Sequence, residues 1–419
     1  MKRILALALC ALFALNAEAR TLYVDASRPN NNGNGRSSKT AKKTLQAAIN
    51  IARKGDTIIV APGSYSSITT NNKKIRIKAK NGSAKTTIFG KKGTYKTKKY
   101  PSSVDGWGSY TMYGGGAAIA KLGREISKSC HLLVTKGKYF DTTVRSAAIT
   151  KGNATTLSGF TLDGKQIHCG DYYHAGVLVS KSKPTKRKTD LAYAVAGVSG
   201  GTVVSCVLKN CGNAPIAVNS KLSACKIMDN ASTDGGERGI ESSTFSRCTF
   251  TGNDFRKSSS QPYSCLINAD YLGGVNNSKF DNCLFATNAK LPFFSCSLVN
   301  CTVADNSSVS LSKIKAYNTI FYKVSASQFK KAKKNTLKNC YKGSNPKFVS
   351  TENDDYRLAV GSPCLDKGTN AKAAKKLYGK KDLAGNKRVQ GKSVDIGCYE
   401  GAFDVSYDWD DGDHDHGVY

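Results

Sequence analysis

The sequence is poor in acidic residues, histidine and proline, and it lacks a long apolar run beyond its first nineteen positions. Only 30 aspartates and glutamates accompany 63 lysines and arginines in 419 residues, so the formal net charge is +33. Without a later stretch of about 20 apolar residues, no transmembrane helix is expected in the rest of the chain. A hydrophobic fraction of 40% excludes a chain that is disordered throughout. The 39 glycines beside 9 prolines favour many turns over long helices.

The first nineteen residues have the pattern of an export signal. Lys2 and Arg3 give a basic start, residues 4–15 are apolar, and Ala17-Glu18-Ala19 forms a small-x-small cleavage site. Fourteen cysteines also favour a location outside the cytosol. We therefore expect residues 1–19 to be a cleaved signal peptide and the mature protein to be secreted or held at the cell surface.

An internal repeat follows the template apolar-x-x-Cys-x-apolar-x-x-Asn. Complete copies begin at Leu222, Phe245, Phe280 and Leu298. The central cysteines recur every 17 to 23 residues, at Cys206, Cys225, Cys248, Cys265, Cys283 and Cys301. A unit of this length cannot bury an apolar face alone, so neighbouring units must stack on each other.

The alternation of Cys with the apolar residue two positions later indicates a short strand with one face inside. No helical pattern alternates with these strands, which favours an all-β parallel solenoid over a leucine-rich repeat. In a β-helix the cysteines would line the interior as small hydrophobic side chains. The asparagine would occupy the turn, where its side chain tolerates the left-handed conformation and hydrogen-bonds its neighbours.

The same patterns divide the chain into segments. Residues 44–54 place Leu45, Ala48, Ile49 and Ala52 on one helical face, as expected for a helix that caps the open end of the stack. We expect a signal peptide at 1–19, a β-helix with its cap at 20–345, an inserted Lys/Tyr/Gly-rich region at 91–129, a terminal segment at 346–403 and an acidic, histidine-containing tail at 404–419.

Two groups of residues resemble known families. Thr44-Leu-Gln-Ala-Ala-Ile49, with Gly55-Asp-Thr-Ile58 and Ala61-Pro-Gly-Ser-Tyr65, resembles the amino-terminal signature of the secreted right-handed parallel β-helix, or pectate-lyase-like, superfamily. Tyr356-Arg-Leu358, Gly361-Ser-Pro-Cys364, Asp382-Leu-Ala-Gly385 and Asp395-Ile-Gly-Cys-Tyr-Glu400 resemble the bacterial choice-of-anchor Q segment. The resemblance implies a right-handed parallel β-helix and surface association, and it specifies no reaction.

Hydrolases of this fold that cleave pectin use paired carboxylates, a Gly-His-Gly and a late Arg-Ile-Lys. The sequence contains no Gly-His-Gly. Its one Arg-Ile-Lys, Arg76-Ile77-Lys78, lies near the amino terminus. The sequence therefore does not support that class of hydrolase.

A lyase of this fold would need a cation, such as calcium, and a basic side chain to remove the proton. Calcium binds several converging oxygen ligands, and stacking could bring together acidic residues from successive coils. The candidate metal ligands are Asp234, Glu237, Glu241, Asp254 and Asp270, and the candidate bases are Arg238 and Arg256. The alternative, favoured by the frequency of charged turns, is that these are solvated turn residues and surface ion pairs. No cofactor is assigned otherwise.

The positive charge favours a polyanionic partner. Lysines cluster at 91–99, 183–188, 330–338 and 372–381, mostly outside the cysteine strands. Candidate sugar-binding residues are Tyr95, Lys96, Lys98, Lys99 and Tyr100. The expected partner is an anionic polysaccharide or a cell-envelope polymer. The export signal argues against nucleic acid as the partner. We expect the protein to be a monomer. The lysines could also serve solubility alone.

Three questions stay open at this level. Cys364 and Cys398 both lie in the terminal segment and could form a disulfide there. The number of mature cysteines is odd, so at least one is unpaired unless it pairs between chains. The Asp/His tail could bind a divalent metal or fold back on the basic body. The leading function is polysaccharide binding, with a calcium-dependent uronate lyase and a structural or adhesive surface protein as alternatives.

Overall fold

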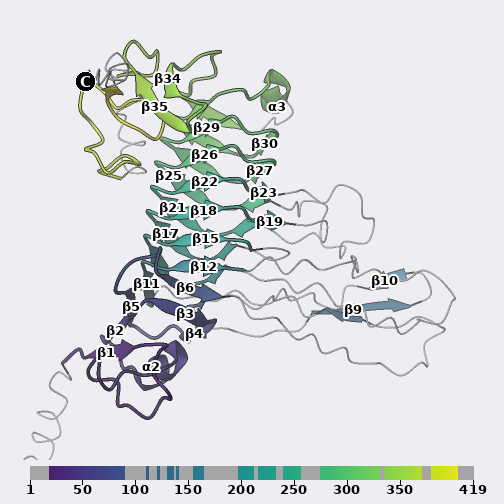
Figure 1. The fold of residues 1–419 in the computed structure, drawn as a ribbon. Coiled ribbons are helices and arrows are strands. Elements are labelled where there is room, and N and C mark those ends of the chain that lie inside the picture. Colours follow the sequence, from purple (N-terminus) through teal and green to yellow (C-terminus); the bar gives the residue numbers. More distant parts are fainter. Residues whose placement is uncertain are drawn as a thin grey trace, which may run out of the picture.

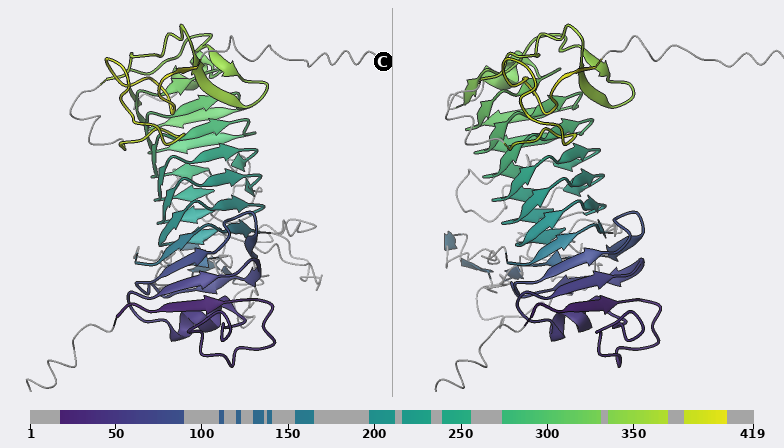
Figure 2. Two further views of the ribbon diagram at one scale, coloured as in Figure 1. Left: turned by 60° about the vertical axis from the view of Figure 1, so that its left-hand side comes forward. Right: turned by 90° about the vertical axis from the view of Figure 1, so that its left-hand side faces the viewer.

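The computed structural model describes residues 18–89, 110–112, 120–122, 130–135, 138–140, 154–164, 197–211, 216–232, 239–255, 274–330, 335–369 and 379–403. Most of them form one elongated stack of short coils (Figure 1). A typical coil contributes one strand to each of three long sheets, which we call A, B and C, and the coils at the two ends contribute fewer. The views in Figure 2 show the sheets as separate faces of the stack.

Sheet A has eleven strands and runs the full length of the stack. In spatial order its strands are β1 (Thr21–Val24), β2 (Thr57–Val60), β5 (Arg76–Ala79), β11 (Thr156–Ser158), β14 (Thr202–Val204), β17 (Lys221–Ser223), β21 (Thr244–Ser246), β25 (Lys279–Asp281), β28 (Ser297–Val299), β31 (Lys315–Tyr317) and β33 (Thr336–Lys338).

Sheets B and C form the other two faces. Sheet B consists of β3 (Gly63–Ser66), β6 (Thr86–Phe89), β12 (Thr161–Asp163), β15 (Val207–Lys209), β18 (Lys226–Met228), β22 (Thr249–Thr251), β26 (Leu284–Ala286), β29 (Thr302–Ala304) and β32 (Ile320–Phe321). Sheet C consists of β4 (Ile68–Thr69), β8 (Ala120–Lys121), β13 (Val198–Ser199), β16 (Ala217–Val218), β20 (Ile240–Glu241), β24 (Val275–Asn276), β27 (Leu291–Phe294) and β30 (Val309–Ser312).

Every pairing within these three sheets is parallel, and equivalent residues of successive coils lie directly over one another. In sheet A, for example, Leu222 pairs with Phe245, Phe245 with Phe280, and Phe280 with Leu298. A crossover between parallel neighbours is right-handed almost without exception. The coils thus wind as a right-handed parallel β-helix, which confirms the predicted fold class.

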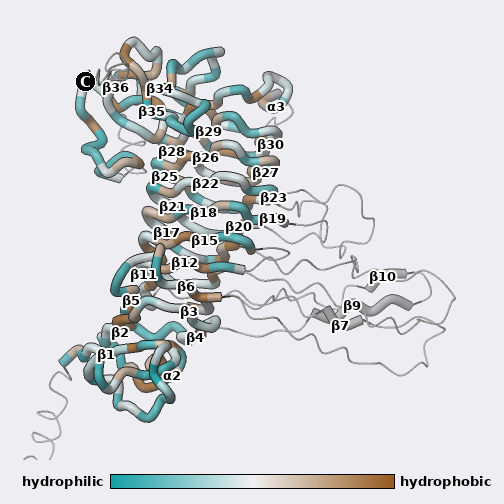
Figure 3. The backbone as a smooth tube through the Cα atoms, viewed as in Figure 1, coloured by the Kyte–Doolittle hydropathy of each residue, from teal (hydrophilic) through white to brown (hydrophobic). Residues whose placement is uncertain are grey.

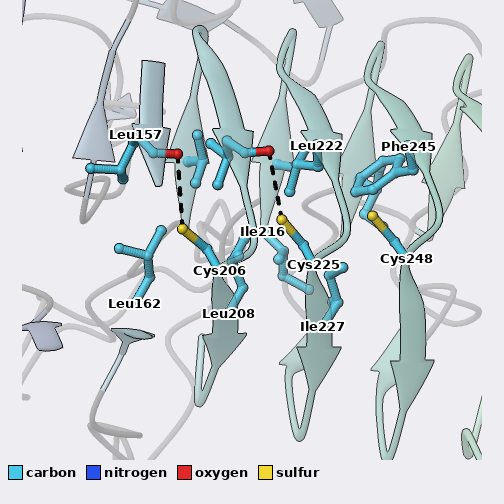
Figure 4. Close-up of a cluster of buried hydrophobic side chains, with 14 of the residues drawn as sticks. Leu157, Leu162, Cys206, Leu208, Ile216, Leu222, Cys225, Ile227, Phe245 and Cys248 are labelled. Carbon is cyan, nitrogen blue, oxygen red and sulfur yellow. Dashed lines mark hydrogen bonds between the residues drawn. The ribbon is translucent and has the colours of Figure 1, made fainter. Parts of the chain in front are cut away.

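The cysteines lie at the corner between sheets A and B, not inside a strand as predicted. Each repeat contains two short strands, and the residue before each cysteine has a left-handed backbone, with φ of 51° at Ala224 and 53° at Arg247. This residue turns the chain and directs the following cysteine inward. Cys225 and Cys248 are therefore buried between the sheets (Figure 4).

The asparagines form a second column at the corner between sheets B and C. The left-handed residue is again the one before the column, such as Asp229 before Asn230 and Thr287 before Asn288. The prediction that asparagine itself adopts this conformation is wrong. The predicted side-chain bonds are confirmed, because Asn253 donates from Nδ2 to Oδ1 of Asn288 over 2.9 Å.

The interior between the sheets is filled by aliphatic, cysteine and phenylalanine side chains. Hydrophobic stretches recur from coil to coil along the stack in Figure 3. Phenylalanines of successive coils stack on each other: the rings of Phe245 and Phe280 are 5.0 Å apart at 12°, and those of Phe250 and Phe285 are 4.5 Å apart at 13°. Stacking of equivalent residues thus lets the repeat build a continuous core.

The helix α2 (Leu45–Ile51) covers the amino-terminal end of the stack (Figure 1). The side chain of Thr44 accepts a hydrogen bond from the backbone of Ala47 and caps the helix. Leu45, Ala48 and Ile49 are buried, as the sequence predicted. The helix is shorter than residues 44–54, because Ala52 already has an extended backbone. In the described ranges no helix is long and apolar enough to span a bilayer.

The carboxy-terminal end of the chain folds back along the outside of sheet B. Its strands β34 (Phe348–Ser350), β35 (Asp355–Ala359) and β36 (Ala402–Phe403) form a small separate sheet. Tyr356 and Cys398 pack on the outward side chains of β26 and β29, and Leu358 packs with Ile320 of β32. The helix α3 (Ala326–Lys330) precedes β33, with Phe329 against Phe321 at 5.4 Å. The terminal segment covers the outer face of sheet B in the last coils.

Remaining strands lie beside the main sheets. The strands β7 (Tyr110–Met112), β9 (Cys130–Thr135) and β10 (Lys138–Phe140) form an antiparallel sheet. The strands β19 (Ala231–Ser232) and β23 (Asp254–Phe255) pair in parallel after β18 and β22. Within the region expected to be an insertion, 91–129, the strand β8 belongs to sheet C. The expected signal peptide, except for residues 18 and 19, and the tail at 404–419 lie outside the described residues.

Candidate functional site

Two residues of the predicted acidic cluster are described, and they lie at different corners of the stack, Glu241 where sheet C leads into sheet A and Asp254 where sheet B leads towards sheet C. Glu241 ends β20 in sheet C, and Asp254 begins β23, which follows sheet B in the next coil. The other members lie outside the described residues: Asp234, Glu237, Arg238, Arg256 and Asp270. The structure therefore places part of the cluster and leaves its calcium and base assignments as predictions.

Glu241 faces outward from sheet C and is half-buried. It pairs in register with Val218 of the preceding coil and Asn276 of the following one. The hydroxyl of Ser243 donates to the backbone carbonyl of Glu241 over 2.8 Å. The left-handed residue between them, Ser242, turns the chain into sheet A. These contacts fix the backbone that carries the carboxylate.

Asp254 is held beside the start of sheet C by the residue that follows it. Phe255 is fully buried, and its ring lies so close to Gly239 that a Cβ there would come within 2.5 Å of it. Gly239 directly precedes β20, so β23 packs against the strand that carries Glu241. On the other side Asp254 forms a parallel bridge with Lys290. Glu241 is in register with Asn276 and Phe294, four residues after Lys290, so the two acids come from adjacent coils but lie at opposite ends of the sheet C strands.

Many of the segments outside the described residues fall, in the sequence, at the corner between sheets B and C. In the sequence, the segments 90–109, 113–119, 165–196, 212–215, 233–238 and 256–273 lie between a strand of sheet B and the next strand of sheet C. The corner between sheets A and B has no such segment, and from β11 onwards only one left-handed and one buried residue separate the two strands there. Variable loops on a rigid scaffold commonly carry function, so this corner is the first place to look for catalysis.

Metal binding finds no support in the part of the chain that the structure describes. Within those ranges there is no group of three or more His, Cys, Asp or Glu side chains that could hold a metal ion. The predicted sugar-binding residues Tyr95, Lys96, Lys98, Lys99 and Tyr100 lie outside the described residues. The described residues show a different site.

That site is the outer face of sheet A, which is strongly basic. Its strands carry six exposed cations, Arg76, Lys78, Lys221, Lys279, Lys315 and Lys338. Asp281 is the only acidic residue in the eleven strands of this sheet. The described strands of sheet B contain two lysines and an aspartate, Lys209, Lys226 and Asp163. The charge is therefore concentrated on one face.

Asp281 is half-buried and hydrogen-bonded to the terminal segment. Its Oδ2 accepts a hydrogen bond from the backbone of Gly379 over 2.9 Å, and its Oδ1 accepts one from Asn282 over 2.9 Å. Burial raises the pKa of Asp281 to about 6, although these hydrogen bonds and the Arg388 charge oppose the rise. The terminal segment thus occupies the one acidic position of the face.

The lysines of sheet A were missed because the sequence template begins one residue too late. Lys221 precedes Leu222, and Lys279 precedes Phe280, the apolar residues that open two copies of the repeat. The equivalent residue is Thr244 in the copy between them. Because this position points away from the core, it shows no apolar pattern, and only alignment of the copies reveals its chemistry.

The terminal segment is held by a buried network built from the residues on which the anchor-like resemblance rests. Nε of Arg388 lies 3.2 Å from Oε2 of Glu400, and the two side chains are 2% and 1% exposed. Asp382 accepts from the backbone of Glu400, and Asp395 accepts from that of Gly401. Buried polar groups of this kind need partners to be tolerated. In the described residues the network is therefore structural.

The disulfide considered between Cys364 and Cys398 is not formed in this structure, because both are free, buried thiols. Cys398 packs beside Tyr356 on sheet B, whereas Cys364 belongs to a second cluster with Leu358. Burial raises the pKa of each thiol to about 12. Two separate apolar contacts take the place of the expected covalent bond.

Comparison with known proteins yields structural similarity without a family assignment. No protein-family model matches the chain, and no curated protein matches its sequence. Among solved structures it is similar to pectate lyase Pel9A at 13% identity and a TM-score of 0.46, covering 93% of this chain and 98% of that one. It is similar to the A-module of Azotobacter vinelandii mannuronan C-5 epimerase AlgE4 at 11% identity and a TM-score of 0.32, covering 75% of this chain and 80% of that one. It is similar to a pectin methylesterase at 13% identity and a TM-score of 0.30, covering 77% of this chain and 93% of that one.

Proposed function

We propose that this protein is exported and binds anionic polysaccharide through the basic outer face of sheet A. The observation that carries the proposal is the concentration of exposed lysine and arginine on that face, where the one acid is occupied by the terminal segment. The formal net charge of +33 adds a long-range attraction for polyanions. The proposed partner is an acidic polysaccharide or cell-envelope polymer outside the cell.

The sheet suits a binding role because it is rigid and continuous. Its strands are in unbroken parallel register from Thr21 to Thr336. The side chains beneath, including Ile77, Leu222 and Phe280, are almost completely buried. Cations on such a surface keep their spacing without a loop having to become ordered, which lowers the entropic cost of binding.

The cysteines at the corners do not suit a nucleophilic role. Cys206 is 1% exposed, and burial raises its pKa to about 12. A thiol that stays protonated and excluded from solvent is unreactive. We therefore attribute the cysteine column to packing and the function of the described residues to their charged surface.

The proposal is tested by chromatography of the mature protein on immobilised pectate, alginate, heparin and a neutral glucan. We expect retention on the three anionic polymers, none on the neutral one, and elution by salt, because exposed charges are screened. Lys221→Ser, Lys279→Ser and Lys315→Ser together should lower the eluting salt concentration. Equal retention of the neutral glucan, or of this variant and the wild type, would overturn the proposal.

A calcium-dependent uronate lyase is the second candidate. It is favoured by the position of Asp254 at the corner between sheets B and C, where Arg256 follows β23 in the sequence and Arg238 precedes Gly239. Ultraviolet absorbance of unsaturated uronate ends, measured with calcium and with chelator, tests it. Activity that is lost in Arg238→Ala or Arg256→Ala would support it, and no absorbance change on any polymer would remove it.

A further inference from the structure

One straight column of outward side chains runs along sheet A. Strand pairing places the first outward residue of each strand directly over the next through all eleven strands. Every member is a hydroxyl residue or a cation: Thr21, Thr57, Arg76, Thr156, Thr202, Lys221, Thr244, Lys279, Ser297, Lys315 and Thr336. The column is therefore a line of hydrogen-bond donors with fixed cations.

The cations in the second half of the column alternate with hydroxyls. The order is Lys221, Thr244, Lys279, Ser297 and Lys315, and the three lysines are exposed. Neighbouring strands lie about 4.8 Å apart. Successive lysines of the column are consequently roughly 9.5 Å apart along the stack.

The other two faces show no comparable column. In sheet B the equivalent line changes from Thr161, Val207 and Lys226 to Thr249 and then to Leu284, which the terminal segment covers. In sheet C the outward line contains Val218, Glu241, Asn276 and Phe294. The alternation is thus a property of one surface and does not follow from the composition of the chain.

We propose that Lys221, Lys279 and Lys315, with Thr244 and Ser297 between them, bind a straight uronate polysaccharide that lies along the stack. This inference rests on the proposed function and adds the geometry of its ligand. In a chain of equatorially 1,4-linked sugars, alternate rings turn opposite faces, so every second carboxylate points the same way. The length of such a disaccharide is close to the spacing of two coils, which lets each lysine meet one carboxylate.

The hydroxyls complete the match. Thr244 and Ser297 lie where the intervening sugar, whose carboxylate points away, presents its own hydroxyls. A hydroxyl side chain can donate and accept hydrogen bonds with those sugar hydroxyls. A lysine at the same position would find no carboxylate to pair with. The phosphates of one strand of duplex DNA follow at about 3.4 Å along the helix axis, so most of them would find no lysine in this column. Regularly spaced uronate is therefore the better occupant.

The test moves one charge by a single coil at constant net charge. The double variant Lys221→Thr, Thr244→Lys keeps composition but breaks the alternation, whereas Lys221→Thr alone removes one cation. Lys226→Thr on sheet B is the matched control, since Lys226 is exposed and outside the column. Binding is measured by isothermal titration with β-1,4-linked glucuronate oligomers, α-1,4-linked galacturonate oligomers of equal charge, and oligo-dT. Thermal unfolding verifies that each variant folds.

We expect the double variant and Lys221→Thr to weaken glucuronate binding by about two- to fivefold each, the size of an exposed ion pair. Lys226→Thr should bind as the wild type does, and the double variant should not change galacturonate or oligo-dT binding. If the double variant and the wild type bind glucuronate oligomers equally, the proposal about the column is rejected, whereas polyanion binding is not. The same conclusion follows if the wild type binds oligo-dT more strongly than glucuronate oligomers. Failure of the wild type to bind any polyanion overturns both proposals.

Discussion

Asn230 donates a hydrogen bond from Nδ2 to Oδ1 of Asn253, which lies directly over it in the next coil, at 3.0 Å. Asn253 makes the same bond to Asn288, and Asn288 makes it to Asn306, so one chain of amides passes through four coils. The donors also reach backbone carbonyls, as between Asn253 and Ile227 at 2.8 Å. The column thus satisfies the polar groups of every turn at this corner.

Replacing Asn253 by Ala should destabilise the protein by about 3 kcal/mol, because it leaves Asn230 and the carbonyl of Ile227 buried without their partner. The free energy of unfolding in urea measures the effect. Asn353→Ala, at an exposed position of the terminal segment, is the control and should change little. Similar losses in the two variants would mean that the amide column does not support the stack.

The phenylalanine stack predicts a large loss on truncation of Phe285. Its ring stacks on Phe250 at 4.5 Å and meets Phe280 and Phe293 edge-on at 5.1 Å each. Phe285→Ala should lower the free energy of unfolding by about 3–5 kcal/mol, since the cavity lies inside a continuous core. Phe285→Leu should lose clearly less. Equal losses would indicate that the coils collapse around the missing ring.

Thiol chemistry distinguishes the buried cysteines from Cys340, which is half-buried. Burial raises the pKa of Cys206 and Cys296 to about 12, and that of Cys340 to about 11. Alkylation of the folded protein at pH 8 should modify Cys340 first and Cys206 only after denaturant is added. In the denatured, unreduced protein Cys364 and Cys398 should both be modified. Their resistance until reductant is added would show a disulfide and contradict the structure.

Glu400 makes stability depend on pH. Burial raises the pKa of this carboxyl from 4.5 to about 8, although the Arg388 charge favours ionisation. The folded state therefore keeps a proton that the unfolded state releases above about pH 4.5, so stability falls as the pH rises towards 8 and then levels off. Glu400→Gln should reduce this slope in urea unfolding between pH 5 and 8.5. Asp355→Asn is the control, because hydrogen bonding to Arg357 lowers the pKa of Asp355, and it should keep the slope. An unchanged slope in Glu400→Gln would contradict the assignment.

The fold could be predicted from sequence because stacking leaves a record at fixed positions. Cysteine and asparagine stand five positions apart in several copies of the repeat, as in Cys225 and Asn230. Parallel, in-register stacking requires such a fixed distance, because equivalent residues of successive coils lie over one another. The corner at Ala224 could not be predicted from the sequence. Two short strands joined by a left-handed residue show the same alternation of apolar and polar residues as one continuous strand. Ala and Arg at that position carry no turn signal of their own.

The candidate site was harder to predict, because outward residues are not constrained by the core. Lys221, Thr244 and Lys279 differ in size and charge, and only strand register shows that they form one line. The acidic cluster was chosen from closeness in sequence, and of its members Glu241 and Asp254 are placed on adjacent coils but at different corners. Segments between sheets follow no repeat, so sequence periodicity gives no position for Arg238 or Arg256.

The most direct measurement is zero-length crosslinking of the mature protein to a uronate oligomer, followed by mass spectrometry of the modified lysines. A carbodiimide joins a carboxylate to an amine only where the two are in contact. The account predicts that Lys221, Lys279 and Lys315 are joined to the polymer and that high salt prevents it. Crosslinks confined to other lysines, such as Lys226 or Lys96, with these three unmodified, would contradict it.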